Sequence, residues 1–300
     1  MNKNVASKHR HISFTAHYTG YIWYKMGISH PQLATPQGKF LAQLAHPFES
    51  CAEKILGGSM RSTLKTRHQL LDAQLTELLA DDPQLQVLEI AAGLSPRGWW
   101  FRQHYPGINY RELDLPAMAQ TKQQALKHIE QHSPEVMAFD LFSNEFKQAF
   151  EHFNPEQRLV VISEGLINYF DKPLLQQLIQ SIAQHGQSFQ QLHYLTDLYP
   201  EPIKHKLAQV IWSSSKLLKL ISRSAFSFHF VSPQQVQHFF QQAGFQHVQV
   251  IQPVTASDHN NNNNNNNNND VSAELRVSTP LDDAHLGDLV WVIHAQRTRT

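Results

Sequence analysis

Hydrophobic residues in the first part of the chain recur at helical spacing. From Pro36 onward they follow one another at steps of three and four positions, and the pair Gly57-Gly58 marks the end of the segment. Leucines at the same spacing then continue to Leu79, with Ser62 or Thr63 available as the N-cap of a second helix. The pattern predicts an N-terminal helical extension over residues 1–83.

The pattern changes after this extension, where short apolar runs alternate with helical stretches as far as Tyr199. The predicted strands are QVLEIAA, INYRELD, EVMAFD, RLVVISEG and QLHYLTDLY. The predicted helices between them are RGWWFRQHY, PAMAQTKQQALKHIEQ, NEFKQAFEHF and PLLQQLIQSIAQH. Such alternation indicates βαβ units. We therefore predict an α/β core over residues 84–199, built on a mainly parallel sheet.

A long helical stripe of apolar residues interrupts the alternation after Tyr199. An aromatic cluster follows it, formed by Phe226, Phe228 and Phe230. We predict that residues 200–231 form an insertion, a helical lid over one end of the sheet. The stripe alone would fit ordinary helix packing equally well, and only its place in the chain favours a lid.

The remaining residues, 232–300, return to the pattern of the core. PQQVQHFFQQAG predicts a helix, and FQHVQVI and DLVWVIHAQ predict two further strands, which brings the sheet to seven. Residues 260–269 are an uninterrupted asparagine run that cannot bury apolar surface. We expect a disordered loop there, without a function. The whole chain, 1–300, then forms one domain with helices on both faces of its sheet.

Composition argues against several classes of protein. The 25 basic and 25 acidic residues give a formal net charge of zero, which offers no strong field for nucleic acid or anionic lipid. The single cysteine, Cys51, excludes an intrachain disulfide framework, and the 19 histidines lack metal-ligand spacing. No apolar run is long enough to span a membrane, and the first residues contain no signal peptide. We expect a soluble, cytoplasmic protein without a metal site.

Acidic residues end three successive predicted strands. Asp114 ends YRELD, Asp140 ends VMAFD, and Glu164 ends VVISEG. Ligands of open α/β sheets bind beyond the carboxyl ends of the strands, where the strand order reverses. We therefore expect the three carboxylates to line one site, although helix N-capping would explain any one of them alone.

The turn AAGL after the first strand supplies small residues for the same site. Gly93 can adopt a positive φ or admit a ligand against the backbone. The fingerprint G-x-G-x-x-G is absent, which removes most of the argument for a pyrophosphate. Asp114 follows Gly93 by twenty-one positions, close to the spacing at which an acidic residue meets a ribose hydroxyl. A cofactor with an adenosine and no phosphate fits this arrangement.

Five segments carry a resemblance to a known family. RHQLLD, EIAAGLSPR, RELDLPAMAQTK, AFDL and ISEGLINYF occur in an order that resembles the leucine carboxyl methyltransferase family. Members of that family are S-adenosylmethionine-dependent O-methyltransferases, with bacterial relatives in polyketide pathways. The resemblance covers roughly residues 61–199, and ELDLP and SEGLINYF are its most specific parts. It implies a Rossmann-like methyltransferase fold, S-adenosyl-L-methionine as cofactor and a small-molecule acceptor.

The resemblance also implies which residues contact the methionine part of the cofactor. Arg67 would pair with the carboxylate, because a guanidinium fork suits a carboxylate. Gly93 would let the backbone approach, and Glu164 would lie near the amino end. From the residues alone, Arg67 reads as a surface arginine, possibly paired with Asp72.

For the adenosine part, the resemblance implies three residues. Asp114 would accept both ribose hydroxyls, while Asp140 and Leu141 would flank the adenine.

The chain departs from the family pattern in the turn after the first strand. Ala91 stands where the family usually has glycine, a small change if its φ stays negative. Ser95 and Pro96 replace an Asp-Thr pair, which puts one supporting hydrogen bond in doubt, and Arg97 is retained with a structural role. Glu89, inside the apolar strand, is a further candidate cofactor contact. A buried carboxylate needs a partner, which we expect to be a loop N–H or Arg67.

The methyl acceptor decides whether a general base is needed. A carboxylate acceptor needs none, whereas a phenol or alcohol does. His193, Tyr194 and Asp197, near the end of the fifth strand, are weak candidates, each at least as well explained by packing. The aromatic N-terminal segment FTAHYTGYIWYKMGI would fold over the substrate or, equally well, cover the core.

These features predict an S-adenosylmethionine-dependent O-methyltransferase that acts on a carboxylate or hydroxyl of a small molecule. A non-catalytic protein of the same fold that binds S-adenosylmethionine as a sensor or scaffold is the alternative. A nucleotide-dependent oxidoreductase is disfavoured by the missing glycine fingerprint. A protein-tail acceptor, as used by eukaryotic relatives, is disfavoured because no charged groove is evident.

Overall fold

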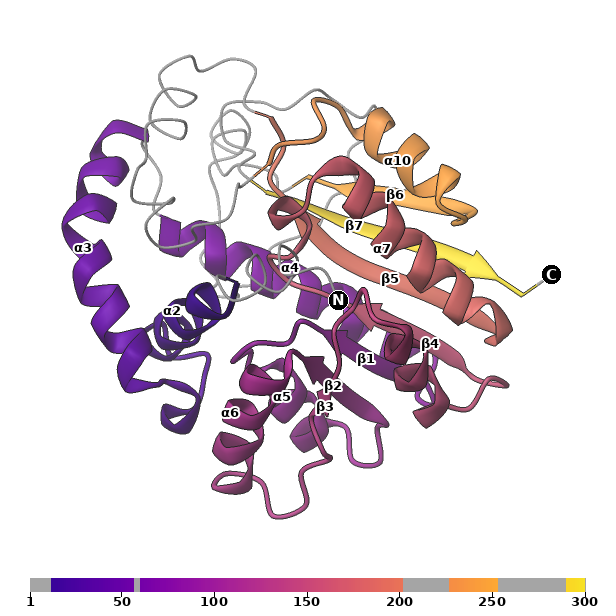
Figure 1. The fold of residues 1–300 in the computed structure, drawn as a ribbon, viewed down its shortest axis with the longest axis horizontal. Coiled ribbons are helices and arrows are strands. Elements are labelled where there is room, and N and C mark those ends of the chain that lie inside the picture. The colour runs from indigo at the N-terminus through magenta and orange to yellow at the C-terminus, as the bar shows by residue number, and fades with distance from the viewer. Residues whose placement is uncertain (1–11, 57–59, 202–226, 253–289, 300) are drawn as a thin grey trace, which may run out of the picture.

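A seven-stranded sheet organises the part of the chain that the computed structural model describes, which is residues 12–56, 60–201, 227–252 and 290–299 (Figure 1). The strands are β1 (Gln86–Ile90), β2 (Tyr110–Asp114), β3 (Met137–Ala138), β4 (Arg158–Ile162), β5 (Gln191–Leu198), β6 (His247–Ile251) and β7 (Trp291–Thr298). Their order is β3-β2-β1-β4-β5-β7-β6. All pairs are parallel except those of β7, which is antiparallel to both neighbours. The predicted, mainly parallel sheet is confirmed, and its order reverses between β1 and β4.

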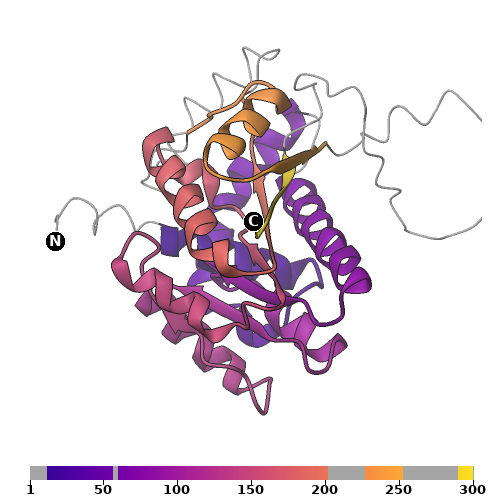
Figure 2. The same cartoon turned by 90° about the vertical axis from the view of Figure 1, so that its right-hand side faces the viewer.

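Helices cover both faces of this sheet, as predicted. They are α2 (Ile12–Lys25), α3 (Pro36–Leu56), α4 (Met60–Asp81), α5 (Arg97–His104), α6 (Pro116–Lys127), α7 (Lys172–His185) and α10 (Pro233–Gln242). Four 3-10 segments accompany them: η1 (Pro31–Leu33), η2 (Asn144–His152), η3 (Ile167–Tyr169) and η4 (Gly186–Ser188). Apolar residues of α7, α10 and η2 pack on one face, and those of α4 and α5 pack on the other. Figure 2 shows α4 opposite α7 and α10.

Local chemistry sets where the helices around the sheet begin. Proline occupies one of the first two positions of α6, α7 and α10, where its missing N–H costs nothing. Asp171 caps α7 by accepting a hydrogen bond from the Leu174 N–H, and Ser232 caps α10 in the same way through the Gln235 N–H. Because each helix begins within a few residues of the preceding segment, the carboxyl ends of the strands remain free to build a site.

Two local expectations are wrong, and a third is refined. NEFKQAFEHF forms a helix, as predicted, and this helix is the 3-10 segment η2 with Phe146, Ala149 and Phe150 buried. Strand β3 has two residues rather than six, as suits the edge of a sheet. Helix α4 begins at Met60, so neither serine nor threonine further along serves as its N-cap.

The predicted lid and the asparagine run lie largely or wholly outside the described residues, in 202–226 and 253–289. The two described ends of the predicted insertion are adjacent, because the Glu201 N–H donates to the Phe230 carbonyl at 2.9 Å. Phe230 packs against Phe239 of α10, in the core of one sheet face.

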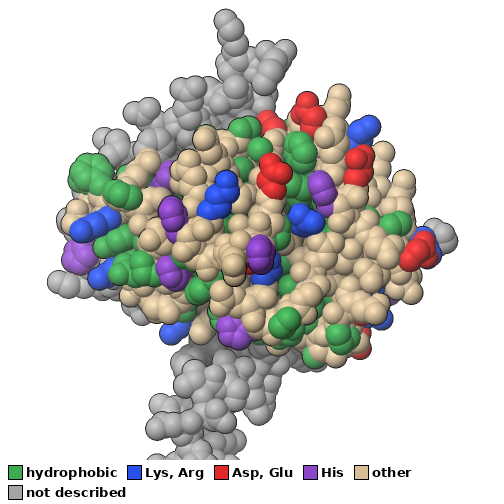
Figure 3. Space-filling model, turned by 90° about the horizontal axis from the view of Figure 1, so that it is seen from below, with side chains coloured by type: hydrophobic (Ala, Val, Ile, Leu, Met, Phe, Trp, Pro, Cys, Tyr) green, Lys and Arg blue, Asp and Glu red, His purple; other side chains and the backbone are tan. Residues whose placement is uncertain are grey.

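The described residues offer neither a membrane span nor a metal site. None of their helices is both long enough and apolar enough to cross a membrane. Within the same ranges, no group of three or more His, Cys, Asp or Glu side chains could hold a metal ion. On the face in Figure 3, histidines are spread among hydrophobic and basic side chains.

A buried histidine, His193, meets a partly buried one, His294, between β5 and β7. His193 Nδ1 lies 2.8 Å from His294 Nε2, and His193 Nε2 lies 3.1 Å from Gln191 Oε1. Burial, together with the charge of His294, lowers the pKa of His193 to about 3. Burial alone lowers the pKa of His294 to about 4. Both side chains are therefore neutral in the folded protein near neutral pH.

This pair predicts a loss of stability in acid. Each histidine has a lower pKa when folded than in the unfolded chain, where it lies near 6.5, so the unfolded state binds more protons below that pH. The free energy of unfolding should fall as the pH drops from 6.5 toward 4, by up to about 1.4 kcal/mol per pH unit for each histidine. Urea unfolding between pH 7.5 and 4.5 measures the slope. His294→Gln should reduce it, and an unchanged slope would contradict the assignment.

Candidate cofactor site

The turn between β1 and α5 holds the end of β2 in place. The Gly93 N–H donates to Asp114 Oδ2 at 2.7 Å, and the Leu115 N–H donates to Asp114 Oδ1 at 2.7 Å. Gly93 has a φ of +49°, a conformation that glycine adopts without strain. The structure thus brings Gly93 and Asp114 together, as their spacing predicts.

Ala91 adopts a φ of +49° in the same turn, so the condition under which its replacement of glycine would be a small change is not met. For a residue with a Cβ the left-handed region costs about 1–2 kcal/mol. The turn keeps the backbone path that glycine allows, and Ala91 carries the strain.

A pocket opens beside this turn, between the ends of β2, β3 and β4. It brings together three of the predicted residues: Asp114, Asp140 and Leu141. The rest of its wall is apolar and comprises Ala91, Leu113, Leu115, Phe139, Phe142, Leu166 and Phe170. Phe142 and Phe170 meet edge to face at 5.2 Å, and Asp140 Oδ1 accepts the Phe142 N–H at 3.0 Å. An apolar wall with carboxylates beside it suits a flat ring that bears polar edges.

The environment of Asp114 changes its titration. Burial raises its pKa to about 6, while the N–H groups of Gly93 and Leu115 act in the opposite direction. Asp114 therefore changes charge close to neutral pH.

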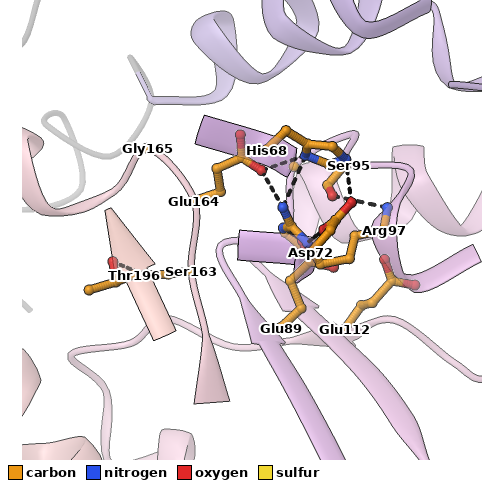
Figure 4. Close-up of polar contacts among 12 residues, drawn as sticks. His68, Asp72, Glu89, Ser95, Arg97, Glu112, Ser163, Glu164, Gly165 and Thr196 are labelled. Carbon is orange, nitrogen blue, oxygen red and sulfur yellow. Dashed lines mark hydrogen bonds and ion pairs between the residues drawn. The ribbon is translucent and has the colours of Figure 1, made fainter. Parts of the chain in front are cut away.

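A buried ion cluster lies on the other side of the turn (Figure 4). We define it by seven residues: Arg67, His68 and Asp72 of α4, Glu89 of β1, Arg97 of α5, Glu164 after β4, and Asp197 of β5. Five of them are buried residues, the Glu164 side chain is 3% exposed, and Asp72 is partly exposed. The cluster joins two helices to the ends of three neighbouring strands.

Arg97 occupies the centre of the ion cluster. Its guanidinium contacts Asp72 through Nε at 2.5 Å, Glu89 through Nη1 at 3.1 Å and Glu164 through Nη2 at 2.7 Å. These three ion pairs are consistent with the structural role predicted for Arg97. Glu89 also accepts the Tyr110 hydroxyl at 2.9 Å, so the expectation that a loop N–H or Arg67 satisfies Glu89 is wrong.

Arg67 is buried, so its interpretation as a surface arginine paired with Asp72 is wrong. Its Nε donates to Glu164 Oε1 at 2.9 Å, and its Nη1 donates to the Tyr199 hydroxyl at 3.2 Å. Gly165 has a φ of +67°, and a Cβ there would lie 3.1 Å from Arg67 Nη1. The glycine after Glu164 therefore leaves room for the guanidinium.

Glu164 receives three contacts from cationic or ionisable side chains. Besides Arg67 and Arg97, His68 Nδ1 lies 2.8 Å from its Oε2. Burial alone would raise the pKa of Glu164, but His68, Arg67 and Arg97 hold it well below its usual range. Glu164 is thus ionised and held in a fixed position.

The three candidate bases on β5 separate into different environments. Asp197, near the carboxyl end, belongs to the ion cluster. Tyr194 is a core residue whose hydroxyl lies 2.9 Å from Ser163 Oγ and whose ring stacks on Phe240. His193 shares the sheet face of Asp197 but lies four residues earlier, about 13 Å along the strand. The structure does not bring His193 or Tyr194 to the cluster.

Helix α2 covers the turn and the ion cluster. A Cβ at Gly93 would lie 3.1 Å from Ala16 Cβ, and one at Gly20 would lie 2.7 Å from Leu94 Cβ. The Trp23 ring lies 5.2 Å from the ring of His68. The aromatic N-terminal segment therefore packs over the strand ends that the sequence marks as a site.

Asn168 is a residue that sequence reasoning missed. Its side-chain amide donates to the carbonyls of Tyr199 at 3.1 Å and Ser227 at 2.8 Å, and its Oδ1 accepts the Tyr199 N–H at 2.8 Å. It fixes the chain on both sides of residues 202–226. Asn168 lies within ISEGLINYF, one of the segments that carry the family resemblance, and this position could have marked it as a candidate.

Several solved structures that resemble this chain are described as methyltransferases. A proposed methyltransferase from Thermobifida fusca superposes with a TM-score of 0.54 at 10% identity, covering 89% of this chain and 90% of that one. A proposed O-methyltransferase from Nostoc punctiforme has a TM-score of 0.48 at 14% identity, covering 79% of this chain and 58% of that one. Magnesium protoporphyrin IX methyltransferase from Synechocystis, solved with S-adenosylhomocysteine, has a TM-score of 0.46 at 14% identity, covering 86% and 99%.

The chain has the Rossmann-like fold of S-adenosylmethionine-dependent methyltransferases. The family model for leucine carboxyl methyltransferase matches residues 32–183, half of the chain, and the protein belongs to that family. A search among curated proteins finds no match. The chain spans 58% of the Nostoc protein and 50% of another structural neighbour, PigF.

The ion cluster predicts a large loss of stability when its central cation is removed. Arg97→Gln leaves three carboxylates without their shared partner and should lower the free energy of unfolding by about 3–5 kcal/mol. Urea unfolding measures the loss.

Arg158→Gln is the matched control for this variant. Arg158 pairs with Asp81 at 2.6 Å, but the Arg158 side chain is partly exposed and that of Asp81 is exposed, so the loss should be about 0–1 kcal/mol. Equal losses for the two variants would show that Arg97 does not hold the cluster together.

Proposed function

We propose that this protein transfers a methyl group from S-adenosyl-L-methionine to an oxygen, in a carboxylate or hydroxyl, of a small-molecule acceptor. One observation carries the proposal in this member of the family. A pocket with Asp114, Asp140 and Leu141 lies on one side of the glycine turn, and a buried guanidinium, Arg67, lies on the other.

The residues present fit the adenosine part of this cofactor. The apolar wall with Phe142 and Phe170 suits an adenine, and Asp140 and Leu141 line the same pocket. Asp114 stands at its edge, where its carboxylate would accept ribose hydroxyls. Gly93 would leave room for the part of the cofactor that leads from the ribose toward Arg67.

The ion cluster fits the charge of the cofactor. It contains four carboxyl groups, Asp72, Glu89, Glu164 and Asp197, and two guanidinium groups. This excess of acidic groups favours a positively charged ligand. Arg67 would pair with the methionine carboxylate, since a guanidinium fork matches a carboxylate.

The cofactor, when bound, supplies a methyl group on a positively charged sulfur. The protein must hold the acceptor oxygen in line with that methyl, roughly 3 Å away. The negative charge of an ionised acceptor oxygen and the positive charge of the sulfonium are both neutralised during transfer. A site that excludes water therefore favours the reaction. Helix α2, which packs on Gly93 and Leu94, would exclude water from this edge of the sheet.

The positions of the candidate bases favour a carboxylate acceptor. A carboxylate needs no proton acceptor, whereas a hydroxyl does. His193 and Tyr194 are engaged elsewhere, and only Asp197 of the three lies in the ion cluster. The balance of 25 acidic and 25 basic residues favours a small acceptor over a charged protein tail.

Binding and turnover measurements test the function. Calorimetry should detect binding of S-adenosylhomocysteine and none of NAD. A methyl-transfer screen over carboxylates, phenols and alcohols should then find an acceptor. Binding without turnover on any acceptor would favour a sensor, and binding of NAD instead would contradict the proposal.

The pKa of Asp114 predicts how cofactor affinity depends on pH. Only the ionised carboxylate can accept two hydroxyl hydrogen bonds, and its pKa is about 6. The dissociation constant for S-adenosylhomocysteine should therefore rise about tenfold between pH 7 and pH 5. Asp114→Asn should bind more weakly at pH 7, by about 1–3 kcal/mol, and should lack this pH dependence. A variant with the wild-type affinity and profile would remove Asp114 from the site.

A further inference from the structure

Asp197 carries an oxygen that its surroundings leave without a hydrogen bond. Its side chain is 1% exposed, and its Oδ1 accepts the Gly165 N–H at 2.6 Å. Within the described part of the chain, no donor forms a hydrogen bond with Oδ2. The nearest ion-pair contact is Arg67 Nη1 at 3.6 Å, too far for a hydrogen bond. A buried carboxylate oxygen in this condition is costly unless a ligand satisfies it.

Glu164 is in the opposite condition. Its Oε1 accepts from Arg67 Nε at 2.9 Å, and its Oε2 lies 2.7 Å from Arg97 Nη2 and 2.8 Å from His68 Nδ1. The protein therefore already supplies three partners to this carboxylate. A further cation would have to displace one of them.

The distance between Arg67 and Asp197 suits an amino acid. An α-amino acid carries its ammonium and carboxylate on the same carbon, so a protein that binds both groups needs a cation and a carboxylate side by side. Arg67 and Asp197 are adjacent, both buried, and separated by 3.6 Å without a hydrogen bond between them. Gly165 links the two, since its N–H binds Asp197 and its missing Cβ leaves room for Arg67.

We propose that Asp197 binds the ammonium group of the cofactor's methionine part, beside Arg67, which binds its carboxylate. Glu164 is then a positioning residue that orients the Arg67 guanidinium. This differs from the role that the family resemblance implies for Glu164, and it rests on the proposed function. The electrostatics of Asp197 support this assignment. Burial raises the pKa of Asp197, and a cation bound at Oδ2 would oppose that rise and keep the carboxylate ionised.

A ligand series tests the assignment by calorimetry. S-Adenosylhomocysteine carries both groups, and its deaminated analogue keeps the carboxylate and lacks the ammonium. The wild-type protein should prefer S-adenosylhomocysteine by tenfold or more. Asp197→Asn should lose that preference, binding S-adenosylhomocysteine at least tenfold more weakly and the deaminated analogue as the wild type does. Glu164→Gln should weaken both ligands by the same factor, since it acts through Arg67.

Other outcomes separate the two proposals. If Asp197→Asn keeps the wild-type preference, or Glu164→Gln alone abolishes it, the role of Asp197 is overturned while the proposed function stands. A wild-type protein without any preference between the ligands overturns it too, and that result needs no variant. A wild-type protein that binds neither ligand overturns both proposals. Thermal unfolding monitors folding, and Asp197→Ser, which removes the carboxylate but keeps a small polar side chain, replaces an Asp197→Asn protein that does not fold.

Discussion

The burial of Arg97 among three carboxylates is the constraint on which the rest of the site depends. Its guanidinium joins Asp72 of α4, Glu89 of β1 and Glu164 at the end of β4, so one cation fixes a helix to two neighbouring strands. Desolvating these groups costs several kcal/mol for each ion, and only good geometry and several hydrogen bonds offset that cost. The apolar strand tolerates Glu89 for this reason.

The ion cluster and the glycine turn divide the edge of the sheet into two chemically different halves. On one side, Asp114 and Asp140 stand beside an apolar pocket. On the other, Glu164 holds Arg67, and no described residue donates a hydrogen bond to Asp197 Oδ2. Both lie where the strand order reverses between β1 and β4, the usual ligand position of an open α/β sheet. The arrangement suits a ligand with an aromatic ring at one end and an amino acid at the other.

The sequence predicts the parts of this site that depend on local pattern. Gly93 and Asp114 meet because adjacent parallel strands place their carboxyl ends together, a rule that needs no side-chain detail. The partner of Glu89 was beyond such reasoning, because Arg97 reaches back across the turn from a helix. The predicted strand QLHYLTDLY ends within one residue of β5, but grouping His193 with Asp197 overlooked the four residues, about 13 Å along the strand, that separate them. The φ of Ala91 was left open, because the residue type alone does not fix whether its backbone is left-handed.

A crystal structure with bound S-adenosylhomocysteine tests the central claim most directly. The account predicts the adenine between Asp140 and the apolar wall, the ribose hydroxyls on Asp114, and the amino-acid end at Arg67 across Gly93. A ligand bound elsewhere, or one that lies in this pocket with its amino-acid end turned away from the ion cluster, would contradict it.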